Sequence, residues 1–438
     1  MSTESITAFV AEFLQFCDDQ VARRTWVDWV FYFAPVMVFL ELPRYYLPML
    51  GLIVCRWLKL PRVDRAQREA FMKRAPMVSV VIAGRNEEEA IEGSIRSLLE
   101  QDYPNFEVIV IDDGSEDRMY EIASRYARQG KIRLIKNAAE RGRAGRPSAT
   151  NMGVRLANGE FIVSLDADTS YDRTMLRHLI APMADPRIGV VAGNVLPENT
   201  DVNLITRLQT IEYAMGIDIN KQWTAMLGTT VQASGAIGCF RRSAVLDIGC
   251  WEQELAEDSD ISLRMIKVGW RIAFAPEAVA RTDVPDTWGV LSRQRARWDR
   301  GGLRTLFKKH TRLLRPSSGG LVFAIELYSQ LFFFLLVTLA YPIYLVWLIT
   351  HGLFLAVFVL GISAGIYAVL SVLSIGAIAI LSDRIPQPWK LVGAALLLPA
   401  YKGCLRWVRL RAFLEEFLQV GTEDGYLPTT AWANTRRF

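Results

Sequence analysis

The sequence has few metal-binding side chains and no paired cysteines. Its 438 residues include only five cysteines and three histidines, and no two cysteines have the CxxC spacing of a zinc site. We therefore expect neither a zinc site nor a disulfide framework, and we interpret the cysteines as reduced thiols of a domain that faces the cytoplasm. The first 25 residues lack a basic segment followed by an apolar run, so no cleaved signal peptide is predicted.

The sequence also lacks an excess of charge of one sign. It has 50 basic and 46 acidic residues, a net charge of +4, which argues against a generally basic nucleic-acid binder, and no nucleic acid partner is expected. A GxGxxG loop, a Walker loop and internal repeats are absent as well. The content of hydrophobic residues is 51%, with 22% charged residues, which is too apolar for an ordinary soluble enzyme and too charged for a pure membrane bundle. The composition thus predicts a soluble-like domain attached to membrane spans.

One apolar segment lies near the N-terminus. Within the predicted transmembrane segment 26–58, the run Trp29–Cys55 is almost wholly apolar, interrupted by Glu41 and Arg44, and tryptophans lie near both ends, as is typical of a transmembrane segment. Its prolines leave two alternatives, one kinked span or two short ones, of which we favour one span. The N-terminal segment 1–25 carries acidic residues and a basic cluster begins at Arg56, so the positive-inside rule places the chain beyond this segment in the cytoplasm.

A second membrane region is predicted at residues 320–412, with two to three spans, and a tail at 413–438 follows it. Two runs are uncharged and long enough to cross a bilayer, whereas a third is interrupted by a lysine and an arginine. The runs are Leu327–Thr350, Leu353–Leu381 and Leu391–Trp407. Three spans would place the last basic cluster outside, against the positive-inside rule, so either the last segment lies in the membrane interface or the count differs.

Residues 76–300 have the pattern of a globular domain. Short β-rich runs alternate with amphipathic helical runs, which favours a mainly parallel α/β sheet whose ligands bind at the carboxyl ends of the strands. The predicted strands are Val78–Ala83, Phe106–Ile111, Arg133–Ile135, Glu160–Leu165 and Gly189–Val195, and the predicted helices include Ala90–Leu99 and Met119–Ala127.

A basic amphipathic segment, residues 301–318, follows the globular part. Apolar side chains such as Leu303 and Leu306 fall on one helical side, and most lysines and arginines fall on the other. This pattern predicts a helix in the membrane interface that is attracted to anionic lipid. A merely solvated basic face is the alternative.

Two pairs of carboxylates stand at the ends of predicted strands. Asp112 and Asp113 precede Gly-Ser, where they could accept hydrogen bonds from a ribose or a base; an ordinary Asp-Gly turn is the alternative. Asp166 and Asp168 share one face of an extended segment and repel each other unless a cation lies between them. Mg²⁺ or Mn²⁺ that also holds a diphosphate meets that need, whereas one capping and one solvated aspartate are the alternative.

Two further motifs carry chemistry. Glu257 and Asp258 precede an amphipathic helix, and either carboxylate could take a proton from an attacking hydroxyl, although helix capping is the favoured interpretation for this motif alone. The run from Gln294 to Trp298 combines arginines, which pair bidentately with phosphate, with an indole that stacks on a sugar ring.

Taken in this order, the motifs resemble those of the processive family 2 glycosyltransferases, the group that makes cellulose, chitin oligosaccharides, hyaluronan and bacterial poly-N-acetylglucosamine. The resemblance runs from about residue 77 to 315. It implies an α/β GT-A glycosyltransferase domain, with a mainly parallel sheet, flanked by transmembrane helices. Two departures are mild: Ala256 replaces the usual threonine before Glu257, and Arg146 stands where relatives often have lysine.

The resemblance also implies roles for single residues. Asp258 is the implied base with Glu257 beside it, and Asp166 and Asp168 hold Mg²⁺ or Mn²⁺ at the diphosphate. The residues implied to bind the nucleotide-sugar are Asn86, Glu87, Asp112, Asp113, Arg146, Asp166, Gln294, Arg295 and Arg297. Those implied to bind the acceptor are Ser234, Gly235 and Trp298.

The predicted function is that of a membrane-embedded, inverting and processive glycosyltransferase. It extends a β-linked exopolysaccharide from a UDP-sugar, with UDP-GlcNAc favoured over UDP-glucose, and passes the polymer across the inner (plasma) membrane, where the multi-pass protein has its catalytic domain on the cytoplasmic side. Expected partners are the UDP-sugar donor, the growing polysaccharide, the lipid bilayer and small membrane or periplasmic export subunits. The alternatives are transfer of one sugar to a lipid carrier and an inactive scaffold subunit of an export complex.

Overall fold

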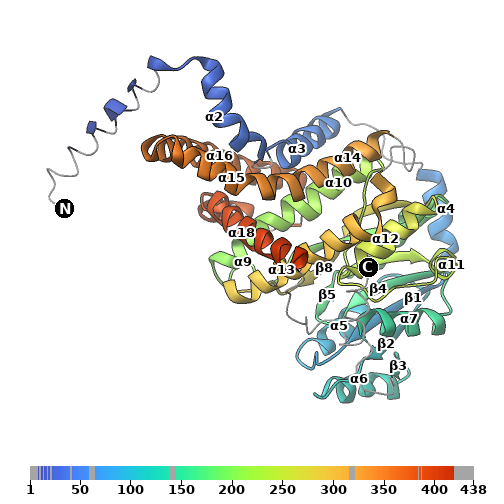
Figure 1. Cartoon of the computed structure of the whole chain (residues 1–438). Coiled ribbons are helices and arrows are strands. Elements are labelled where there is room, and N and C mark those ends of the chain that lie inside the picture. The colour runs from blue at the N-terminus through green and yellow to red at the C-terminus, as the bar shows by residue number, and fades with distance from the viewer. Residues whose placement is uncertain are drawn as a thin grey trace.

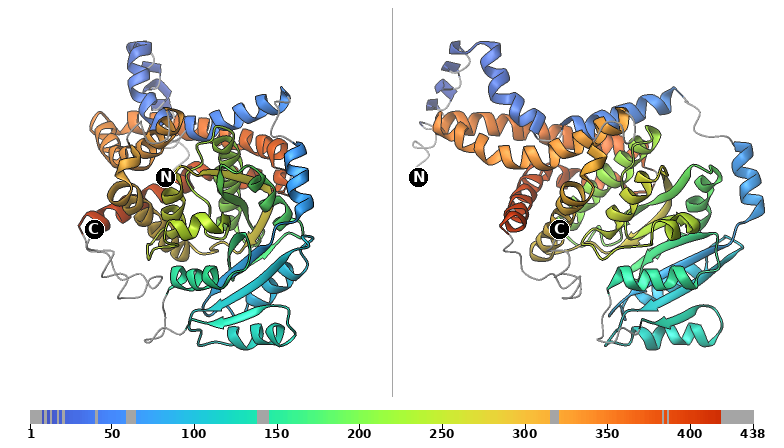
Figure 2. Two further views of the ribbon diagram at one scale, coloured as in Figure 1. Left: turned by 90° about the vertical axis from the view of Figure 1, so that its right-hand side faces the viewer. Right: turned by 45° about the vertical axis from the view of Figure 1, so that its right-hand side comes forward.

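The protein consists of a sheet domain and a layer of long apolar helices beside it (Figure 1). The structure, a computed structural model, describes residues 22–39, 42–58, 65–137, 145–314, 321–382, 384–385 and 387–418, with short stretches between residues 8 and 19. Figure 2 shows the same two parts from other sides, with the apolar helices covering one side of the sheet domain.

The sheet has eight strands in the order β3-β2-β1-β4-β7-β6-β8-β5. The pairs β1–β2, β1–β4, β2–β3 and β6–β8 are parallel, whereas β4–β7, β6–β7 and β5–β8 are antiparallel. The predicted mainly parallel sheet is therefore confirmed. The strands are β1 (Val78–Gly84), β2 (Phe106–Asp112), β3 (Arg133–Lys136), β4 (Phe161–Asp166), β5 (Thr169–Tyr171), β6 (Ile188–Pro197), β7 (Ile237–Arg241) and β8 (Arg271–Thr282).

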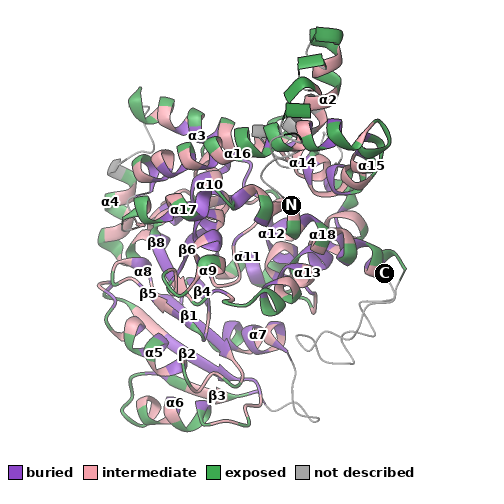
Figure 3. Ribbon diagram, turned by 90° about the vertical axis from the view of Figure 1, so that its left-hand side faces the viewer, coloured by how far each residue is buried: buried purple, intermediate pink, exposed green. Residues whose placement is uncertain are grey.

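Both faces of the central strands are buried. Val80 and Ile82 of β1 pack in one apolar cluster, and Val81 and Ala83 pack in another on the opposite face, as the alternation of side chains along a strand requires. Figure 3 shows these strands buried between exposed helix surfaces. A strand that is buried on both faces is an almost continuous apolar run, which is why these strands were recognisable in the sequence.

Helices connect the strands and cover both faces of the sheet. The predicted helices over 90–99 and 119–127 are present as α5 and α6. The helical elements of the sheet domain are α4 (Arg65–Arg74), α5 (Ile91–Leu99), α6 (Met119–Arg128), α7 (Arg146–Leu156), α8 (Met175–Ile180), η1 (Ala181–Ala184), α9 (Leu204–Tyr213), η2 (Ala214–Ile219), α10 (Asn220–Met226), α11 (Arg242–Asp247), α12 (Glu257–Lys267), α13 (Trp288–Arg304), η3 (Thr305–Lys309) and η4 (Thr311–Leu314).

The C-terminal part contains two helices, among the residues described, that are long and apolar enough to cross a membrane. The first, Leu321–Thr350, is formed by α14 (Leu321–Leu331), η6 (Phe332–Leu336) and α15 (Val337–Thr350), and the second is α16 (Leu353–Leu381). A third candidate is bent by 67° between Pro388–Ala395 and Leu398–Phe417. It comprises η7 (Pro388–Leu391), α17 (Val392–Ala395) and α18 (Leu398–Phe417), and α18 extends beyond the predicted boundary at residue 412.

The segment 26–58 forms two helices instead of the favoured single span. They are α2 (Trp26–Phe39) and α3 (Leu42–Trp57), of 14 and 16 residues, and Figures 1 and 2 show them running in different directions. Each is shorter than the roughly 20 residues of an ordinary span. The alternative of two short elements therefore describes this segment better, and whether they cross a membrane stays a prediction.

The basic segment 301–318 differs from the predicted interface helix. Its first residues end α13, a π-helical turn and a 3₁₀ turn follow, and residues 315–320 lie outside the described part. The basic side chains contact the protein's own carboxylates: Arg304 and Lys308 pair with Glu416, and Lys309 pairs with Asp260. These three cations are therefore used inside the fold, which removes them from the predicted lipid-facing surface.

Candidate active site

A cleft of about 930 Å³ lies at the carboxyl ends of β1 and β4. Ligands of parallel sheets bind at this edge, where the chain turns out of the strands. The opposite wall is formed by α13, and the rim includes Arg44 of α3 and Phe334 of η6. The cleft therefore extends from the sheet to helices of the apolar layer.

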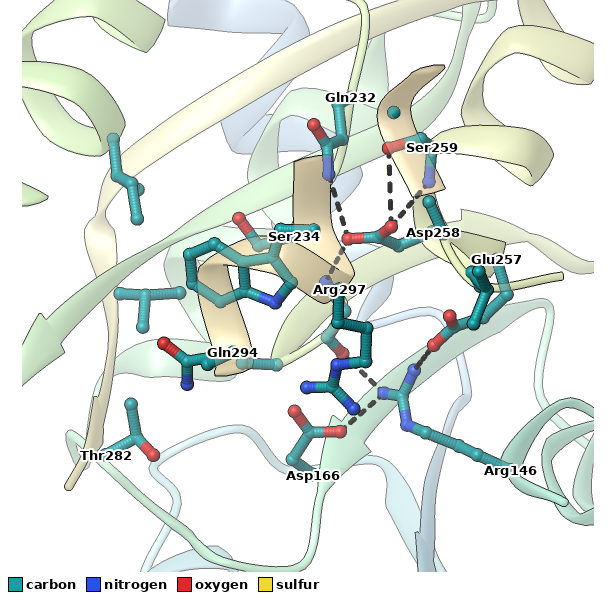
Figure 4. Close-up of a pocket in the computed structure, with 18 of the residues that line it drawn as sticks. Arg146, Asp166, Gln232, Ser234, Glu257, Asp258, Ser259, Thr282, Gln294 and Arg297 are labelled. Atoms are coloured by element: carbon teal, nitrogen blue, oxygen red, sulfur yellow. Dashed lines mark hydrogen bonds and ion pairs between the residues drawn. The ribbon is translucent and has the colours of Figure 1, made fainter. Parts of the chain in front are cut away.

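The carboxylate of Asp258 faces this cleft from the first turn of α12 (Figure 4). Its Oδ2 accepts hydrogen bonds from Gln232 Nε2 at 2.9 Å and from the backbone N–H of Gly235 at 3.0 Å. Its Oδ1 accepts a hydrogen bond from the backbone N–H of Ser259 at 2.7 Å. These three donors are uncharged. They orient the carboxylate but do not neutralise its negative charge.

Arg146, at the start of α7, joins three parts of the site. Its guanidinium forms ion pairs with Glu257 and, at 2.6 Å, with Asp166, and it donates a hydrogen bond to the carbonyl oxygen of Gly235 at 2.7 Å. A Cβ atom at position 235 would lie 3.2 Å from Arg146 Nη1, so glycine permits this close approach. Glu257 is buried in this contact, whereas the predicted contact of Arg146 with donor phosphate stays a prediction.

The two neighbouring aspartates at the end of β2 have different surroundings. Asp113 lines the cleft, and its carboxylate accepts hydrogen bonds from Asn137 Nδ2 and from the backbone N–H of Gly145, each at 2.8 Å. Asp112 is fully buried, and its Oδ1 accepts a hydrogen bond from the backbone N–H of Ser115 at 3.1 Å. Asp112 thus stabilises the turn instead of facing the cleft, which is the alternative considered for this motif.

Asn86 lies at the cleft in a left-handed backbone conformation, with φ at 57°. Asparagine tolerates this region better than most residues. Its Oδ1 accepts a hydrogen bond from the backbone N–H of Glu116 at 2.8 Å, so the side chain braces the loop after β2. This arrangement holds the two strand-end loops together at the place where a nucleoside was predicted to bind.

Glu87, Asp166 and Asp168 give one side of the cleft a concentration of negative charge. Desolvation between the cleft walls and, second, the Asp166 carboxylate raise the pKa of Asp168. Desolvation together with the neighbouring aspartates raises the pKa of Glu87 to about 7. A hard cation such as Mg²⁺ or Mn²⁺ would stabilise the ionised forms of these carboxylates, and carboxylate oxygens are the ligands that such cations prefer.

Side chains alone do not complete a metal site there. Within the described ranges, no group of three or more histidine, cysteine, aspartate or glutamate side chains is placed to hold a metal ion. A cation at Asp168 would therefore need further oxygen ligands, and the oxygens of a donor diphosphate would supply them. The residues thus fit a metal that binds together with its substrate.

Three of the four motif residues on α13 reach the cleft. Gln294, Arg297 and Trp298 line it, because residues spaced by three and four share one face of a helix. Gln294 Oε1 is buried and has no hydrogen-bond partner among the described residues, so it is available to a ligand hydroxyl. Arg295 points to the other side, where it donates to Glu212 at 2.9 Å and lies over the Trp298 ring at 4.3 Å. Arg295 is outside the residues that line the cleft, and its predicted contact with the donor stays a prediction.

Comparison with known proteins identifies the domain. Residues 79–248 match the family described as Glycosyl transferase family 2. The chain contains a family 2 glycosyltransferase domain. The poly-beta-1,6-N-acetyl-D-glucosamine synthases of Staphylococcus epidermidis and Staphylococcus aureus strain COL are each 32% identical to it over 233 residues, which is 53% of this chain and 56% of theirs. The chain therefore spans about half the length of the curated relatives it matches.

A solved structure supports the fold of the glycosyltransferase domain. The mannosyltransferase PcManGT from Pyrobaculum calidifontis, in complex with GDP-Man and Mn²⁺, superposes with a TM-score of 0.59 over 88% of this chain and 99% of that chain. The sequence identity is 22%, so this likeness shows the fold alone. The predicted GT-A fold is confirmed.

Sequence reasoning missed Lys221 of the glycosyltransferase domain. Lys221 lies on α10, lines the cleft and donates a hydrogen bond to Ser234 Oγ at 2.7 Å, beside the predicted acceptor residues Ser234 and Gly235. Burial lowers the pKa of Lys221 to about 8, and the carboxylate of Asp258 opposes this shift. The short helix carrying Lys221 has no motif in the sequence, so nothing in the residue pattern indicated a functional lysine there.

A second group that was missed lies behind Asp258. Asp260 is fully buried, and its carboxylate lies 2.7 Å from His310 Nε2 and 2.8 Å from Lys309 Nζ. Burial alone would raise the pKa of Asp260, but hydrogen bonds to His310 and Lys309 outweigh it and hold the pKa below its usual value. Helix α12 is thereby anchored to the chain that follows α13.

Proposed function

We propose that the protein is a membrane-embedded, inverting and processive glycosyltransferase that extends a β-linked polysaccharide of N-acetylglucosamine from UDP-GlcNAc. The observation that carries the proposal is the position of Asp258 in one cleft with Asp168 on one side and Gln294 and Trp298 on the other. The printed names of the relatives, poly-beta-1,6-N-acetyl-D-glucosamine synthases, support this sugar and this product.

The chemistry assigned to the chain is a single displacement. The acceptor hydroxyl attacks the anomeric carbon of the donor, the bond from that carbon to the diphosphate oxygen breaks, and the hydroxyl proton passes to the Asp258 carboxylate. The hydrogen bonds from Gln232 and Gly235 orient this carboxylate, and a positioned base of this kind contributes roughly 10²–10⁴-fold to the rate. A divalent cation bound at Asp168 and the diphosphate would stabilise the leaving group's charge, and Arg297 would add to this.

Processive extension and export are proposed from the borders of the cleft. Trp298 is exposed at the cleft, where its indole can stack on the terminal sugar of the acceptor. The cleft continues to Gln330 and Phe334 of the first long apolar helix and to Arg44 of α3. A growing chain held by Trp298 would therefore leave the site along helices of the membrane layer.

The proposed location is the plasma membrane, with several spans and with the glycosyltransferase domain on the cytoplasmic side. Two long apolar helices support membrane insertion, and the basic cluster that begins at Arg56 supports the orientation. UDP-sugars and Mg²⁺ or Mn²⁺ would then reach the cleft from the cytoplasm.

The test is synthesis from defined donors. Membranes that contain the full-length protein are incubated separately with labelled UDP-GlcNAc and UDP-glucose and with Mg²⁺ or Mn²⁺, and products are sized on a gel and digested with glycosidases of known specificity. The proposal expects a long, glycosidase-sensitive polymer from UDP-GlcNAc. A product limited to one sugar on a lipid would instead favour transfer to a lipid carrier, and the absence of transfer and donor hydrolysis would favour a scaffold subunit.

A further inference from the structure

Helix α18 lies along α13, the helix that carries Gln294, Arg297 and Trp298 (Figure 1). It belongs to the C-terminal part, beyond the residues that match the glycosyltransferase family. Polar side chains at the two ends and in the middle of α18 reach carboxylates or cations of the catalytic part. The contact is therefore built from charge pairs as well as from apolar packing.

The first polar contact joins three helices. Tyr401 of α18 donates its hydroxyl hydrogen to Glu212 Oε2 of α9 at 2.8 Å, and Arg295 of α13 donates to the same oxygen at 2.9 Å. Arg295 is buried and lies over the ring of Trp298, so this contact fixes a residue that touches the cleft's indole.

The second contact lies in the middle of α18. Arg409 Nε donates to Asp299 Oδ1 of α13 at 2.9 Å, and the Arg409 guanidinium lies 5.1 Å from the centre of the Phe334 ring. Phe334 also packs against Phe413 of α18, with ring centres 4.9 Å apart. Since Phe334 lines the cleft, α18 contacts two walls of the site, α13 and η6.

The third contact lies at the end of α18. Glu416 accepts hydrogen bonds from Arg304 Nε and Lys308 Nζ, each at 2.8 Å, and its side chain is only 5% exposed. Buried charge pairs of this kind contribute little net stability, but the loss of one partner leaves a charge without compensation. Such pairs therefore restrict the position of one helix on another more than they strengthen the fold.

A displacement of α13 would reach the catalytic loop directly. Gly301 of α13 packs so closely on Ala256 that a Cβ atom at position 301 would lie 2.9 Å from the Ala256 Cβ. Ala256 directly precedes Glu257 and Asp258. The position of α13 therefore determines where the residues of one cleft wall lie and where the loop that holds the predicted base lies.

The same contacts place α18 on the side of the catalytic cleft. Tyr401, Arg409 and Glu416, spread over most of the helix, all contact the sheet domain or the turns that follow α13. A helix that contacts the catalytic part along its length does not carry its basic cluster to the opposite side of a membrane. The conflict with the positive-inside rule is thus removed by the first of the sequence-based alternatives, a last segment that lies at the interface.

We propose that α18 is a positioning helix, whose Tyr401, Arg409 and Glu416 hold α13 and Phe334 in the geometry that sugar transfer requires. The inference rests on the proposed function, since its readout is transfer from UDP-GlcNAc. These three residues act through α13 and η6 and do not themselves bind substrate.

The test compares Arg409→Gln with Arg411→Gln in the full-length protein in membranes. Arg411 is a matched control because it is an arginine of the same helix whose partner is the neighbouring Glu415, and its side chain is 81% exposed. For each variant, kcat and KM are measured with UDP-GlcNAc, and the affinity for UDP alone is measured by titration. Tyr401→Phe, Glu416→Gln and the conservative Arg409→Lys complete the set.

Misplacement of reacting groups by about 1 Å lowers rates by up to about 100-fold, so Arg409→Gln is expected to reduce kcat by about 10- to 100-fold. The UDP affinity of Arg409→Gln should stay within about threefold of the wild type, because the predicted nucleoside contacts lie at the ends of β1 and β2. The conservative variant Arg409→Lys should restore most of kcat. Arg411→Gln should stay within about twofold.

Two results would overturn the inference. One is an Arg409→Gln enzyme as active as the Arg411→Gln enzyme, and the other is a joint loss of UDP binding and kcat in all three α18 variants, which indicates a merely structural helix. If the wild-type protein itself transfers no sugar from UDP-GlcNAc, the proposed function fails and this inference falls with it. If the wild type and the α18 variants are all active, only the positioning role is rejected and the proposed function stands.

Discussion

Arg146 forms an ion pair with Glu257, the residue directly before Asp258. The two adjacent carboxylates therefore differ in their surroundings, because Glu257 is buried against a guanidinium whereas Asp258 receives hydrogen bonds from the Gln232 amide and from backbone N–H groups. A carboxylate that is paired with arginine is a poor proton acceptor. This difference supports the proposal that Asp258 is the base and that Glu257 has a supporting role.

The first prediction concerns Asp258→Asn. Asparagine keeps the size of the side chain but removes the basic oxygen, so sugar transfer is expected to fall by about 100-fold or more. Binding of UDP alone should stay within about twofold, since Asp258 lies beside Gly235, which is predicted to bind the acceptor. Transfer is measured as polymer formed in purified membranes, and UDP affinity is measured by titration.

The matched control is Asp247→Asn, which removes a carboxylate from the exposed surface of α11 in the same domain. This variant should behave like the wild type. A normal polymer yield from Asp258→Asn would reject the assignment of the base.

The second prediction concerns Glu257→Gln. The Arg146 guanidinium keeps its contacts with Asp166 and Gly235 but loses the charge of Glu257, so transfer should fall by roughly tenfold, less than in Asp258→Asn. Arg146→Lys should give a similar loss because a single ammonium cannot make all three contacts. The double variant should be little worse than either single variant, which a double-mutant cycle measures. A loss in Glu257→Gln as deep as in Asp258→Asn would instead indicate that Glu257 takes part in proton transfer.

The third prediction is a pH dependence set by Lys221. Burial lowers the pKa of this amine to about 8, so its positive charge is present below pH 8 and is lost as the pH rises through that value. Lys221 lines the same cleft as the predicted donor residues and the donor is an anion, so the apparent KM for UDP-GlcNAc is expected to rise roughly three- to tenfold between pH 7 and pH 9. Initial rates at several donor concentrations across this range provide the measurement.

Two variants separate Lys221 from other titrating groups. Lys221→Arg keeps its charge throughout this range, so the rise in KM should disappear or move to higher pH. Lys221→Gln should have a raised KM at every pH. An unchanged pH profile in both variants would show that another group causes the transition.

The strands that position the site could be predicted because they are buried on both faces. Val78–Gly84 and Phe161–Asp166 are apolar runs that lead into the predicted site residues Asn86 and Asp166, and their pattern alone located the ends of β1 and β4. β8 was missed because Pro276 and Glu277 interrupt its apolar pattern, and β5 was missed because it has only three residues. Local pattern therefore identified the parallel half of the sheet better than the antiparallel strands.

The site itself depended on contacts between residues far apart in the chain. The order of the motifs predicted which carboxylates meet in one cleft, but nothing in the spacing showed that Arg295 turns toward Glu212 while Gln294, Arg297 and Trp298 line the cleft. The pairing of Arg304 with Glu416, 112 positions apart, likewise could not be predicted from the basic segment itself. A charge can be read from a sequence, whereas its partner is set by tertiary structure.

The fourth prediction concerns the divalent cation. Removal of divalent ions with a chelator is expected to abolish transfer, and Mn²⁺ or Mg²⁺ should restore it, because the carboxylates at the end of β4 need a cation to receive a diphosphate. Asp168→Asn removes one ionised ligand, so the Mn²⁺ concentration for half-maximal UDP binding should rise by about tenfold or more. UDP binding measured at several Mn²⁺ concentrations tests this without reliance on turnover. Equal UDP affinity with and without metal would reject a metal that binds with the donor.

The fifth prediction concerns Trp298 and the length of the product. Its indole lies at the cleft, oriented by the Arg295 guanidinium above the ring, and it is proposed to stack on the terminal sugar of the growing chain. Loss of a stacking contact worth about 1 kcal/mol should speed release of the chain about fivefold, so Trp298→Ala should make shorter polymers while it consumes donor at a rate within about threefold of the wild type.

Trp288 is the matched control, because it lies on the same helix and is 41% exposed against 43% for Trp298. Trp288→Ala should leave the size distribution on the gel unchanged, since Trp288 is outside the residues that line the cleft. Products of wild-type length from Trp298→Ala would show that the chain is held elsewhere, with Phe334 at the membrane side of the cleft as the next residue to test.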